Sequence, residues 1–402
     1  MNLPTPYYLF YADEFIANYH DLLSCFRAIY PDYQIAYSFK TNYTPAVCRI
    51  ILKLNGYAEV VSDMEYRLAR KIGFPADRIV YNGPGKEACL EECILGNGLL
   101  NIDHFREVER VCALADKVKD RTIFVGIRVN FDIGNGLHSR FGIDAFNGDL
   151  ENALAQLKKH SVNVRGLHFH ISRARDRQAW ERRIAVLLDI ADRMEMLQQN
   201  HLDYIDIGSG MFGKLGNDLK KQFTNIPSYQ DYAEIVAGAM EKHYRQRKKK
   251  PILFTEPGTT LISAYFSLFT KVLDIKTIRN KYFALMDCSY QNIGELCALK
   301  KVPIVKINHA GNEQHYDSVD LVGYTCLEQD VIYQDYSGKL GIGDILEVGN
   351  TGGYSIVEKP PFIHPDIPVY MQENGRITCI KRAQTMEDIF LPYIFSDEGV
   401  SV

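Results

Sequence analysis

Lys40 is a candidate nucleophile because it follows an apolar stretch with the period of a β-strand. Ile35, Tyr37 and Phe39 alternate with small or polar residues, which indicates a buried strand that ends with a lysine. At such a strand end, the ammonium group faces the crevice in which α/β folds bind ligands. A desolvated lysine loses its proton readily and can form a Schiff base with an aldehyde. The alternative is a lysine whose stem is buried and whose ammonium group reaches solvent.

A glycine-rich turn later in the chain could bind a phosphate group. Gly208, Ser209 and Gly210 follow an apolar, strand-like stretch, and such a turn can present bare backbone N–H groups to an anion. Glycine-rich turns after strands are also common for steric reasons alone, so the segment is weak evidence by itself. Its position at the end of the seventh predicted strand, where barrels often bind phosphate, strengthens the interpretation.

Two histidines and a glutamate complete the set of candidate site residues. His168 and His170 are two positions apart in a predicted strand and therefore share a face. No third histidine or carboxylate has the local spacing of a metal site, so we expect no bound metal and favour one imidazole stacked on a flat cofactor. Glu256 ends the eighth predicted strand and could keep a pyridine nitrogen protonated. A lysine, a phosphate-binding turn and such an acid together point to pyridoxal 5′-phosphate.

These residues need a scaffold that brings strand ends together. Between residues 30 and 262, short apolar strands alternate with amphipathic helices eight times, which predicts parallel strands joined by helices. Eight such units in about 230 residues predict a (β/α)8 barrel, or TIM barrel, whose chemistry lies at the carboxyl ends of its strands. The predicted strands are 34–40, 57–62, 78–82, 99–103, 122–130, 164–172, 204–210 and 252–258.

The pattern changes after residue 262. Strand-like runs follow one another without helical periodicity, which predicts a mostly antiparallel β domain, either a barrel or a sandwich. We expect residues 1–29, with a strand near the N-terminus, to join residues 263–402 in this domain. Residues 30–262 would then form the cofactor-binding barrel. A short helix is predicted at 386–395.

Composition and charge argue against several classes of function. The chain of 402 residues has 46 basic and 50 acidic side chains and a net charge of −4, which argues against a nucleic-acid partner. No apolar run has the length of a membrane span, and the N-terminal residues lack the apolar segment of a signal peptide. Nine cysteines, an odd number with irregular spacing, favour reduced thiols. We therefore expect a cytoplasmic protein with no membrane partner.

A series of motifs in collinear order resembles the diaminopimelate and ornithine decarboxylase family. This family belongs to the alanine-racemase-like enzymes that use pyridoxal phosphate. The match begins near the N-terminus and covers nearly the whole chain. The resembling segments are 37–42, 59–65, 140–142, 166–170, 206–210, 256–258, 323–326, 343–344 and 352–354.

The resemblance implies a role for each residue that matches a family motif. Lys40 would hold the cofactor, His170 would stack on its ring, and Glu256 would pair with its pyridinium nitrogen. The turn at 208–210 and Tyr354 would hold the phosphate group. Glu59 would orient the lysine and the cofactor.

The resemblance also implies a reaction and an assembly. We expect a carboxy-lyase that removes the α-carboxylate of an amino acid as carbon dioxide. In the family, the cysteine that matches Cys326 acts from the second subunit of a homodimer with shared active sites and protonates the carbanion. A small buried thiol is the alternative for Cys326 alone.

Other activities remain as alternatives. Racemases and epimerases of the same fold pair the ring nitrogen with an arginine, so Glu256 argues against them. A non-catalytic relative of the decarboxylases is a further possibility, although Lys40 and Cys326 are both present. A barrel hydrolase without a cofactor is the last.

The chain departs from the family at two places that involve a positive charge. An arginine usually follows the Glu-Pro-Gly motif and contacts phosphate or a substrate carboxylate, but this chain has Thr259. The usual Gly-Ser pair after His170 is replaced by Ser172 and Arg173. Arg173, or Arg175 close behind it, could supply the missing charge. The alternative is a surface loop rich in arginine, which continues with Arg177, Arg182 and Arg183.

A third departure concerns the distal group of the substrate. After the cysteine, the family usually has an acidic residue that contacts a distal amine, whereas this chain has Leu327, with Glu328 and Asp330 nearby. We expect Arg173, Glu328 and Asp330 to contact the substrate, and we expect that substrate to be neither meso-diaminopimelate nor free ornithine. Our hypothesis is a specialised amino acid, or an amino acid held on a biosynthetic intermediate or a carrier protein.

Overall fold

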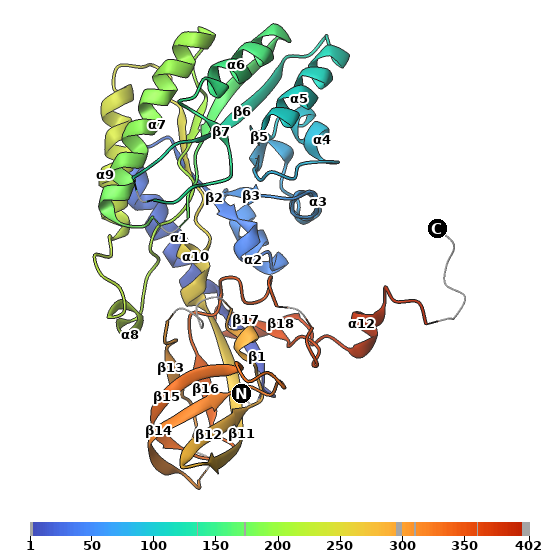
Figure 1. The fold of residues 1–402 in the computed structure, drawn as a ribbon, viewed down its shortest axis with the longest axis vertical. Coiled ribbons are helices and arrows are strands. Elements are labelled where there is room, and N and C mark those ends of the chain that lie inside the picture. Colours follow the sequence, from blue (N-terminus) through green and yellow to red (C-terminus); the bar gives the residue numbers. More distant parts are fainter. Residues whose placement is uncertain are drawn as a thin grey trace. The chain divides into compact units, whose positions relative to one another are not determined.

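Eight parallel strands close into a barrel in the computed structural model, which describes residues 3–134, 136–172, 174–294, 300–308, 311–359 and 361–395. The barrel strands are β2 (Tyr33–Ser38), β3 (Tyr57–Val60), β4 (Ile79–Tyr81), β5 (Leu99–Ile102), β6 (Ile123–Asn130), β8 (Val162–His168), β9 (Tyr204–Asp206) and β10 (Ile252–Thr255). They pair in the order β5-β4-β3-β2-β10-β9-β8-β6, and the pairing of β5 with β6 closes the ring (Figure 1). A two-residue strand, β7 (Ile143–Asp144), pairs with the end of β6. The predicted (β/α)8 barrel is confirmed.

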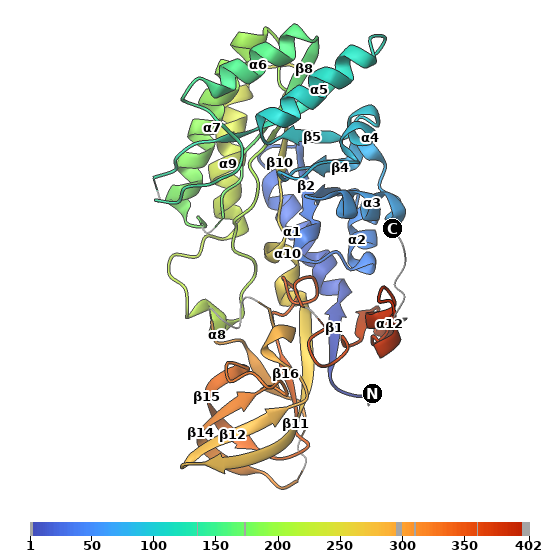
Figure 2. The same cartoon turned by 45° about the vertical axis from the view of Figure 1, so that its right-hand side comes forward.

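Helices lie on the outside of these strands, as Figures 1 and 2 show. They bury an apolar stripe, for example Val47, Ile50 and Ile51 of α2. The helices and 3-10 turns of this part of the chain are α1 (Ala12–Arg27), η1 (Phe39–Thr41), α2 (Pro45–Lys53), α3 (Asp63–Ile72), η2 (Ala76–Arg78), α4 (Leu90–Leu95), α5 (Phe105–Lys117), α6 (Asp149–Lys159), α7 (Arg177–Gln198), α9 (Tyr229–Tyr244) and α10 (Thr259–Ile262). Within the described residues, none of the helices is long and apolar enough to cross a membrane.

The register of strand pairing sets the height of the candidate site residues. Ser38 of β2 pairs with Glu59 of β3, and His168 of β8 pairs with Asp206 of β9. Directly paired residues project from the same face of a sheet, so the two side chains of each pair lie at the same height along the barrel axis. A slip of one residue would turn these side chains to the other face of the sheet.

Several barrel strands end earlier than the sequence predicts. β9 ends at Asp206 because Gly208 and Gly210, with φ of 70° and 106°, leave the extended region. β2 ends at Ser38, so Lys40 lies in the single turn of η1 rather than within the strand. The candidate residues after these two strands therefore lie in the turns that follow them.

The remaining strands form a second sheet, which includes the strand near the N-terminus. Its strands are β1 (Tyr7–Tyr11), β11 (Phe266–Ile278), β12 (Lys281–Met286), β13 (Ile304–Lys306), β14 (Gln314–Val322), β15 (Val331–Leu340), β16 (Ile345–Val348), β17 (Val369–Glu373) and β18 (Arg376–Lys381). β1 lies between β11 and β17. The pairs β1–β17 and β12–β14 are parallel and the other pairs are antiparallel, as predicted for a mostly antiparallel domain. Short elements here are α8 (Asn217–Lys220), η3 (Ser263–Tyr265), η4 (Tyr290–Asn292) and α12 (Met386–Phe390), the last shorter than the helix predicted at 386–395.

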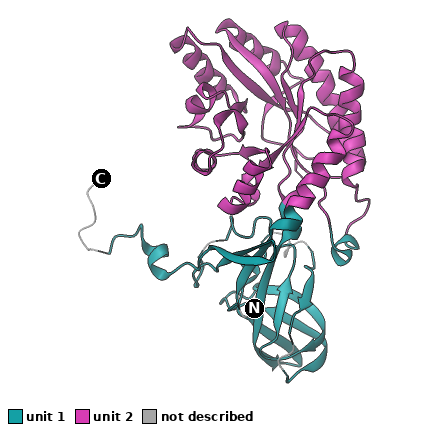
Figure 3. Cartoon of the chain, turned by 180° about the vertical axis from the view of Figure 1, so that it is seen from behind, with its two compact units in different colours: residues 1–15, 215–222, 262–402 teal, residues 16–214, 223–261 magenta. Residues whose placement is uncertain are grey.

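The chain divides into two units whose boundaries differ from the expected ones (Figure 3). The barrel unit comprises residues 16–214 and 223–261, and the β unit comprises residues 1–15, 215–222 and 262–402. Most of α1 therefore belongs to the barrel, because its side chains contact barrel residues. Asn18 donates hydrogen bonds to the carbonyl groups of Thr260 and Leu261. Phe26 stacks on Tyr33 at the start of β2, with 4.4 Å between ring centroids.

Candidate active site

Lys40 forms an ion pair with a buried carboxylate. Its Nζ lies 2.6 Å from Oε2 of Glu59, and the hydroxyl group of Ser38 donates to the same oxygen at 2.6 Å. The side chain of Lys40 is 34% exposed, whereas that of Glu59 is 1% exposed. A lysine at the rim is thus held by an acid that is inaccessible to solvent, which leaves the amine reachable by a ligand and fixed in position.

A network of buried amide groups links Glu59 to Glu256. The side-chain amide of Asn82 donates to Oε1 of Glu59 at 3.2 Å and to Oε1 of Glu256. Its own carbonyl oxygen accepts from Asn101 at 2.9 Å, and Asn101 in turn accepts from the hydroxyl of Tyr204 at 2.8 Å. These side chains come from different strands or the turns after them, so the two carboxylates share one rigid frame.

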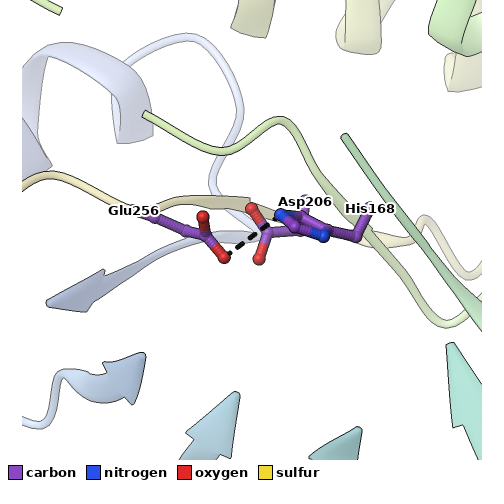
Figure 4. A group of neighbouring side chains, drawn as sticks. All are labelled: His168, Asp206 and Glu256. Carbon is purple, nitrogen blue, oxygen red and sulfur yellow. Dashed lines mark ion pairs between the residues drawn. The ribbon is translucent and has the colours of Figure 1, made fainter. Parts of the chain in front are cut away.

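His168, Asp206 and Glu256 form a buried cluster (Figure 4). Nε2 of His168 lies 3.4 Å from Oε1 of Glu256, and the backbone N–H of Gly208 donates to Asp206 at 2.9 Å. The carboxyl group of Asp206 also interacts with that of Glu256. Within the part of the chain that the structure describes, Nδ1 of His168 is buried without a hydrogen-bond partner. Buried polar atoms without partners are rare, and they indicate a place where a ligand binds.

The two acids of this cluster differ in charge. Burial raises the pKa of Asp206 well above its usual range, and the neighbouring Glu256 adds to this effect. Burial alone would also raise the pKa of Glu256, but the nearby His168 and Lys40 hold that pKa below its ordinary value. Asp206 therefore keeps its proton to higher pH than Glu256, which is the carboxylate of the pair.

The cluster corrects one step in the prediction about metals. A third ligand was not expected beside the histidines because none has suitable local spacing, yet donor atoms of His168, Asp206 and Glu256 lie within 4.8 Å of one another. His168 and Asp206 end β8 and β9, and Glu256 follows β10, so only the register of the barrel brings them together. One nitrogen and two oxygen donors could hold a metal ion. The same charged Glu256 could instead pair with a protonated pyridine nitrogen, as the sequence predicts.

His170 contacts the glycine turn. The backbone N–H of Ser209 donates to Nδ1 of His170 at 3.1 Å. Burial lowers the pKa of His170 well below its usual value, so the ring is neutral and carries its proton on Nε2. A Cβ atom at Gly208 would lie 2.6 Å from the carbonyl oxygen of Phe169 and 2.8 Å from Nδ1 of His170, so only glycine fits.

Arg128 and Asp103 are further rim residues to which the sequence alone gave no role. Nη1 of Arg128 lies 3.2 Å from Oδ1 of Asp103, and Nη2 donates to the carbonyl group of His170 at 3.3 Å. The backbone N–H of Gly142 also donates to Asp103, at 3.2 Å. Like Asn82 and Asp206, they lie near the carboxyl ends of predicted strands, which marks them as rim residues but assigns them no role.

The predicted residues of the β unit are described separately. Cys326 is exposed in the loop between β14 and β15. Glu328 in the same loop is also exposed. Tyr354 has a left-handed φ of 61°. The roles of these three residues stay predictions, and Arg173 lies outside the described residues.

Asp330 holds a loop together instead of presenting a free carboxylate. It is 3% exposed, and its carboxylate accepts hydrogen bonds from the backbone of Tyr290 at 2.8 Å and from both the backbone N–H and the hydroxyl of Thr325, at 3.0 Å and 2.6 Å. Its carbonyl group accepts from Gly323 at 2.9 Å. We therefore assign Asp330 to the loop that carries Cys326 and no longer expect it to contact the substrate.

The residues at the barrel rim fit pyridoxal phosphate. A reachable lysine could hold an aldehyde group, and the turn at 208–210 approaches its neighbours too closely for any residue but glycine at 208. The neutral ring of His170 offers a flat apolar face, and a charged Glu256 lies buried beside His168. Each group therefore has a counterpart in the aldehyde, phosphate, ring face and ring nitrogen of this cofactor.

Sequence comparisons agree with this chemistry. The family described as "Pyridoxal-dependent decarboxylase, pyridoxal binding domain" matches residues 15–263. The diaminopimelate decarboxylase of Aquifex aeolicus is 27% identical over 409 residues, which covers 96% of this chain and 91% of that protein. The enzyme of the same name from Bacteroides thetaiotaomicron is 26% identical over 365 residues and covers 88% and 91%.

Solved structures share the fold. Diaminopimelate decarboxylase from M. jannaschii in complex with L-lysine has a TM-score of 0.86 at 22% identity and covers 98% of this chain and 93% of its own. The Helicobacter pylori enzyme complexed with L-lysine has a TM-score of 0.81 at 23% identity and covers 97% of both chains. The arginine decarboxylase of Paramecium bursaria Chlorella virus has a TM-score of 0.74 at 19% identity, with 90% and 93% covered. Because the family match spans more than half of the chain, this protein belongs to the pyridoxal-dependent decarboxylase family and its cofactor is pyridoxal 5′-phosphate.

Proposed function

We propose that this chain removes the α-carboxylate of an amino acid, with Lys40 holding the cofactor and Glu256 supporting its ring nitrogen. The network around Asn82 carries the proposal. Asn82 donates to Glu59, which pairs with Lys40, and also to Glu256. One amide thus fixes the lysine and the acid relative to each other, as a rigid flat cofactor requires.

The residues of the site have distinct tasks. When bound, pyridoxal phosphate supplies an electron sink for the carbanion that remains after carbon dioxide leaves. Glu256 stays charged and favours a positive charge at the ring nitrogen, which strengthens that sink. Glu59 holds a proton at Nζ of Lys40 and can share it when an amino acid takes the place of the lysine. His170, neutral and partly exposed, offers its ring as a stacking surface.

Protonation and assembly are further parts of the proposal. We assign the proton donor to Cys326 of a second subunit in a homodimer, and a phosphate contact to Tyr354, because both residues match the family motifs. The exposure of Cys326 supports this assignment, since an exposed thiol can reach a partner. Glu328, exposed in the same loop, and Arg173 stay candidates for substrate contact.

Two kinds of amino acid are candidate substrates. meso-Diaminopimelate is the first to test, because the curated relatives described above are named diaminopimelate decarboxylases. Leu327 favours a second candidate, an amino acid without a distal amine, because leucine cannot pair with an ammonium group at a position where the family usually has an acid. The relatives give no support to a carrier-bound substrate, so both candidates are free amino acids.

Release of carbon dioxide from a panel of amino acids tests the activity. The panel contains meso-diaminopimelate, its other stereoisomers, ornithine, arginine, lysine, glutamate and apolar amino acids, each with added pyridoxal phosphate. The proposal predicts release from at least one of them by the wild-type chain and none by Lys40→Ala. Loss of optical activity in an amino acid without release of carbon dioxide would instead favour a racemase. The relatives described above are all named decarboxylases.

A further inference from the structure

Arg183 is a buried arginine that contacts the glycine turn at 207–210. It lies in α7, and its side chain is fully buried. Nη1 donates to the carbonyl groups of Ile207 at 3.4 Å and Ser209 at 2.7 Å, and Nη2 donates to that of Ala174 at 3.2 Å. A Cβ atom placed on Gly210 would be 3.6 Å from Nη2. The alternative of a surface loop rich in arginine therefore does not apply to Arg183.

The guanidinium group has no acidic partner among the described residues. Its hydrogen bonds go to carbonyl groups, and its Nε is buried without a partner. Within the described residues no carboxylate forms an ion pair with it, although Asp176 at the start of α7 acts on it electrostatically. Its carbon atom lies 4.3 Å from the ring centre of Trp180 and 5.8 Å from that of Phe169. Burial lowers the pKa of Arg183 to about 9, so the group remains a cation at neutral pH. A buried cation that no carboxylate pairs with directly is costly, and an anion bound nearby would stabilise it.

Every carbonyl group of the turn at 207–210 accepts a hydrogen bond. Arg183 binds those of Ile207 and Ser209, and the indole N–H of Trp180 donates to that of Gly210 at 3.3 Å. The carbonyl of Gly208 accepts from the backbone N–H of Glu256 at 2.9 Å. A carbonyl that accepts from a cation polarises its peptide and strengthens the N–H group of the next residue as a donor. The N–H of Gly208 already donates to Asp206 and that of Ser209 to His170. The N–H of Gly210, which follows the carbonyl group of Ser209 that Arg183 binds, is therefore the donor that this effect prepares for an anion.

The chain lacks a cation where the resembling family usually has one. Thr259 stands where an arginine usually follows Glu-Pro-Gly and contacts phosphate. Another positive charge near the turn would restore the attraction for a dianion. Among the described residues, Arg183 is the arginine that bonds directly to the turn.

We propose that Arg183 is the positioning cation of the phosphate site. It holds the turn at 207–210 in the shape that binds the phosphate group of the cofactor, and it supplies the positive charge that Thr259 does not. This inference rests on the proposed binding of the phosphate by the glycine turn, and it concerns the phosphate group alone, not the ring.

A comparison of two ligands tests the proposal in the full-length chain freed of cofactor. Affinities for pyridoxal 5′-phosphate and for pyridoxal, which lacks the phosphate group, are measured by absorbance titration for the wild type, Arg183→Met and Arg183→Lys. Arg193→Met is the matched control, because Arg193 also lies in α7 and donates to a backbone carbonyl group, that of Ala145, away from the turn. We expect Arg183→Met to weaken pyridoxal phosphate by about tenfold or more and pyridoxal by less than about twofold. The affinity of Arg183→Lys for pyridoxal phosphate should lie between those of the wild type and Arg183→Met. The control Arg193→Met should change neither affinity.

Each other outcome has a definite meaning. An equal loss of both ligands in the Arg183 variants would show a merely structural role and overturn the proposal, as would no loss at all. If Arg183→Met does not fold, Arg183→Lys is compared with the wild type for the gain in melting temperature caused by inorganic phosphate, which the proposal expects to shrink. A wild-type chain that binds neither ligand would instead overturn the proposed function.

Discussion

Asn82 connects the two carboxylates on which the site depends. Asn82→Ala would remove the amide donor to Oε1 of Glu59 and one of the partners of Oε1 of Glu256, which would keep only its pairing with His168. Since a lost bond to a buried charged group costs about 1.5 to 3 kcal/mol, we expect a fall of about 2 to 4 kcal/mol in the free energy of unfolding. We also expect at least about tenfold weaker binding of pyridoxal phosphate. Urea denaturation and an absorbance titration measure the two effects.

A matched control separates this network from a general effect of asparagine loss. Asn152 is exposed on α6, so Asn152→Ala should change neither quantity. Asn82→Asp should be the more harmful change above neutral pH, because a third carboxylate would then lie between Glu59 and Glu256. Wild-type stability and affinity in Asn82→Ala would show that the network does not position the site.

Glu65 makes the stability of the barrel depend on pH. It is 3% exposed, its carboxylate accepts from the backbone of Val61 at 2.7 Å, and burial raises its pKa to about 7. In the unfolded chain a glutamate has a pKa of about 4.3. The folded state therefore binds the proton more tightly, and the contribution of Glu65 to stability falls as pH rises through this interval. Glu65→Gln removes that loss.

Urea unfolding of the cofactor-free chain at about pH 5 and about pH 8 checks the effect. Relative to wild type, Glu65→Gln should gain stability on the order of 2 kcal/mol between the two conditions. Glu91→Gln is the control, because Glu91 is exposed on α4, and its effect should be the same at both. If the difference between Glu65→Gln and wild type is equal at both pH values, the raised pKa is refuted.

At the scale of single elements, the turn after β9 determines how a phosphate can approach. Gly208→Ala would place a methyl group 2.6 Å from the carbonyl oxygen of Phe169, at a φ of 70° that alanine rarely adopts. We expect a loss of about 2 kcal/mol or more in the free energy of unfolding and a clear loss of affinity for pyridoxal phosphate. Gly148→Ala has a φ of 96° but open space around the new atom, so it should cost less and leave cofactor affinity unchanged. Equal effects of the two changes would contradict this account of the turn.

The type and order of the elements could be predicted because they depend on local patterns. Alternation of apolar strands with amphipathic helices is a property of consecutive residues, and it predicted the barrel and the β domain. The ends of strands depend on tertiary context. β2 ends at Ser38, and the next three residues, including Lys40, form the 3-10 turn η1. β9 ends just before Gly208, which has a positive φ.

The site could be predicted only in part, for a related reason. Lys40, the glycine turn and Glu256 could be identified by type because each follows a strand. The bond between Asn101 and Asn82 spans 19 residues and that between Tyr204 and Asn101 spans 103 residues, so only the register of the barrel shows the network. Arg183 looked exposed because it lies in an arginine-rich segment, and only packing shows which face of α7 is buried.

At the scale of the whole molecule, the proposal predicts that active sites are shared between subunits. Lys40 lies in the barrel unit and Cys326 in the β unit. If Cys326 acts in the site of a partner subunit, Lys40→Ala and Cys326→Ala are each inactive as homodimers. A mixed dimer then keeps one intact site. Random reassortment of equal amounts should restore about a quarter of the wild-type activity.

Carbon dioxide release before and after mixing measures this recovery. The control mixes Lys40→Ala with Glu59→Ala, two changes in the same barrel unit, and should recover nothing. No recovery in the first mixture, or full activity of Cys326→Ala alone, would remove Cys326 from the proposed reaction.

The visible absorbance spectrum of the full-length chain with pyridoxal phosphate tests the central claim most directly. The account predicts an absorbance band that appears when the wild type binds the cofactor and is discharged by sodium borohydride. Mass spectrometry should then locate the reduced cofactor on Lys40. Lys40→Ala should lack the band, even though its glycine turn and Glu256 are intact. A band of equal strength in Lys40→Ala, or label on another lysine, would contradict the claim that Lys40 holds the cofactor at this barrel rim.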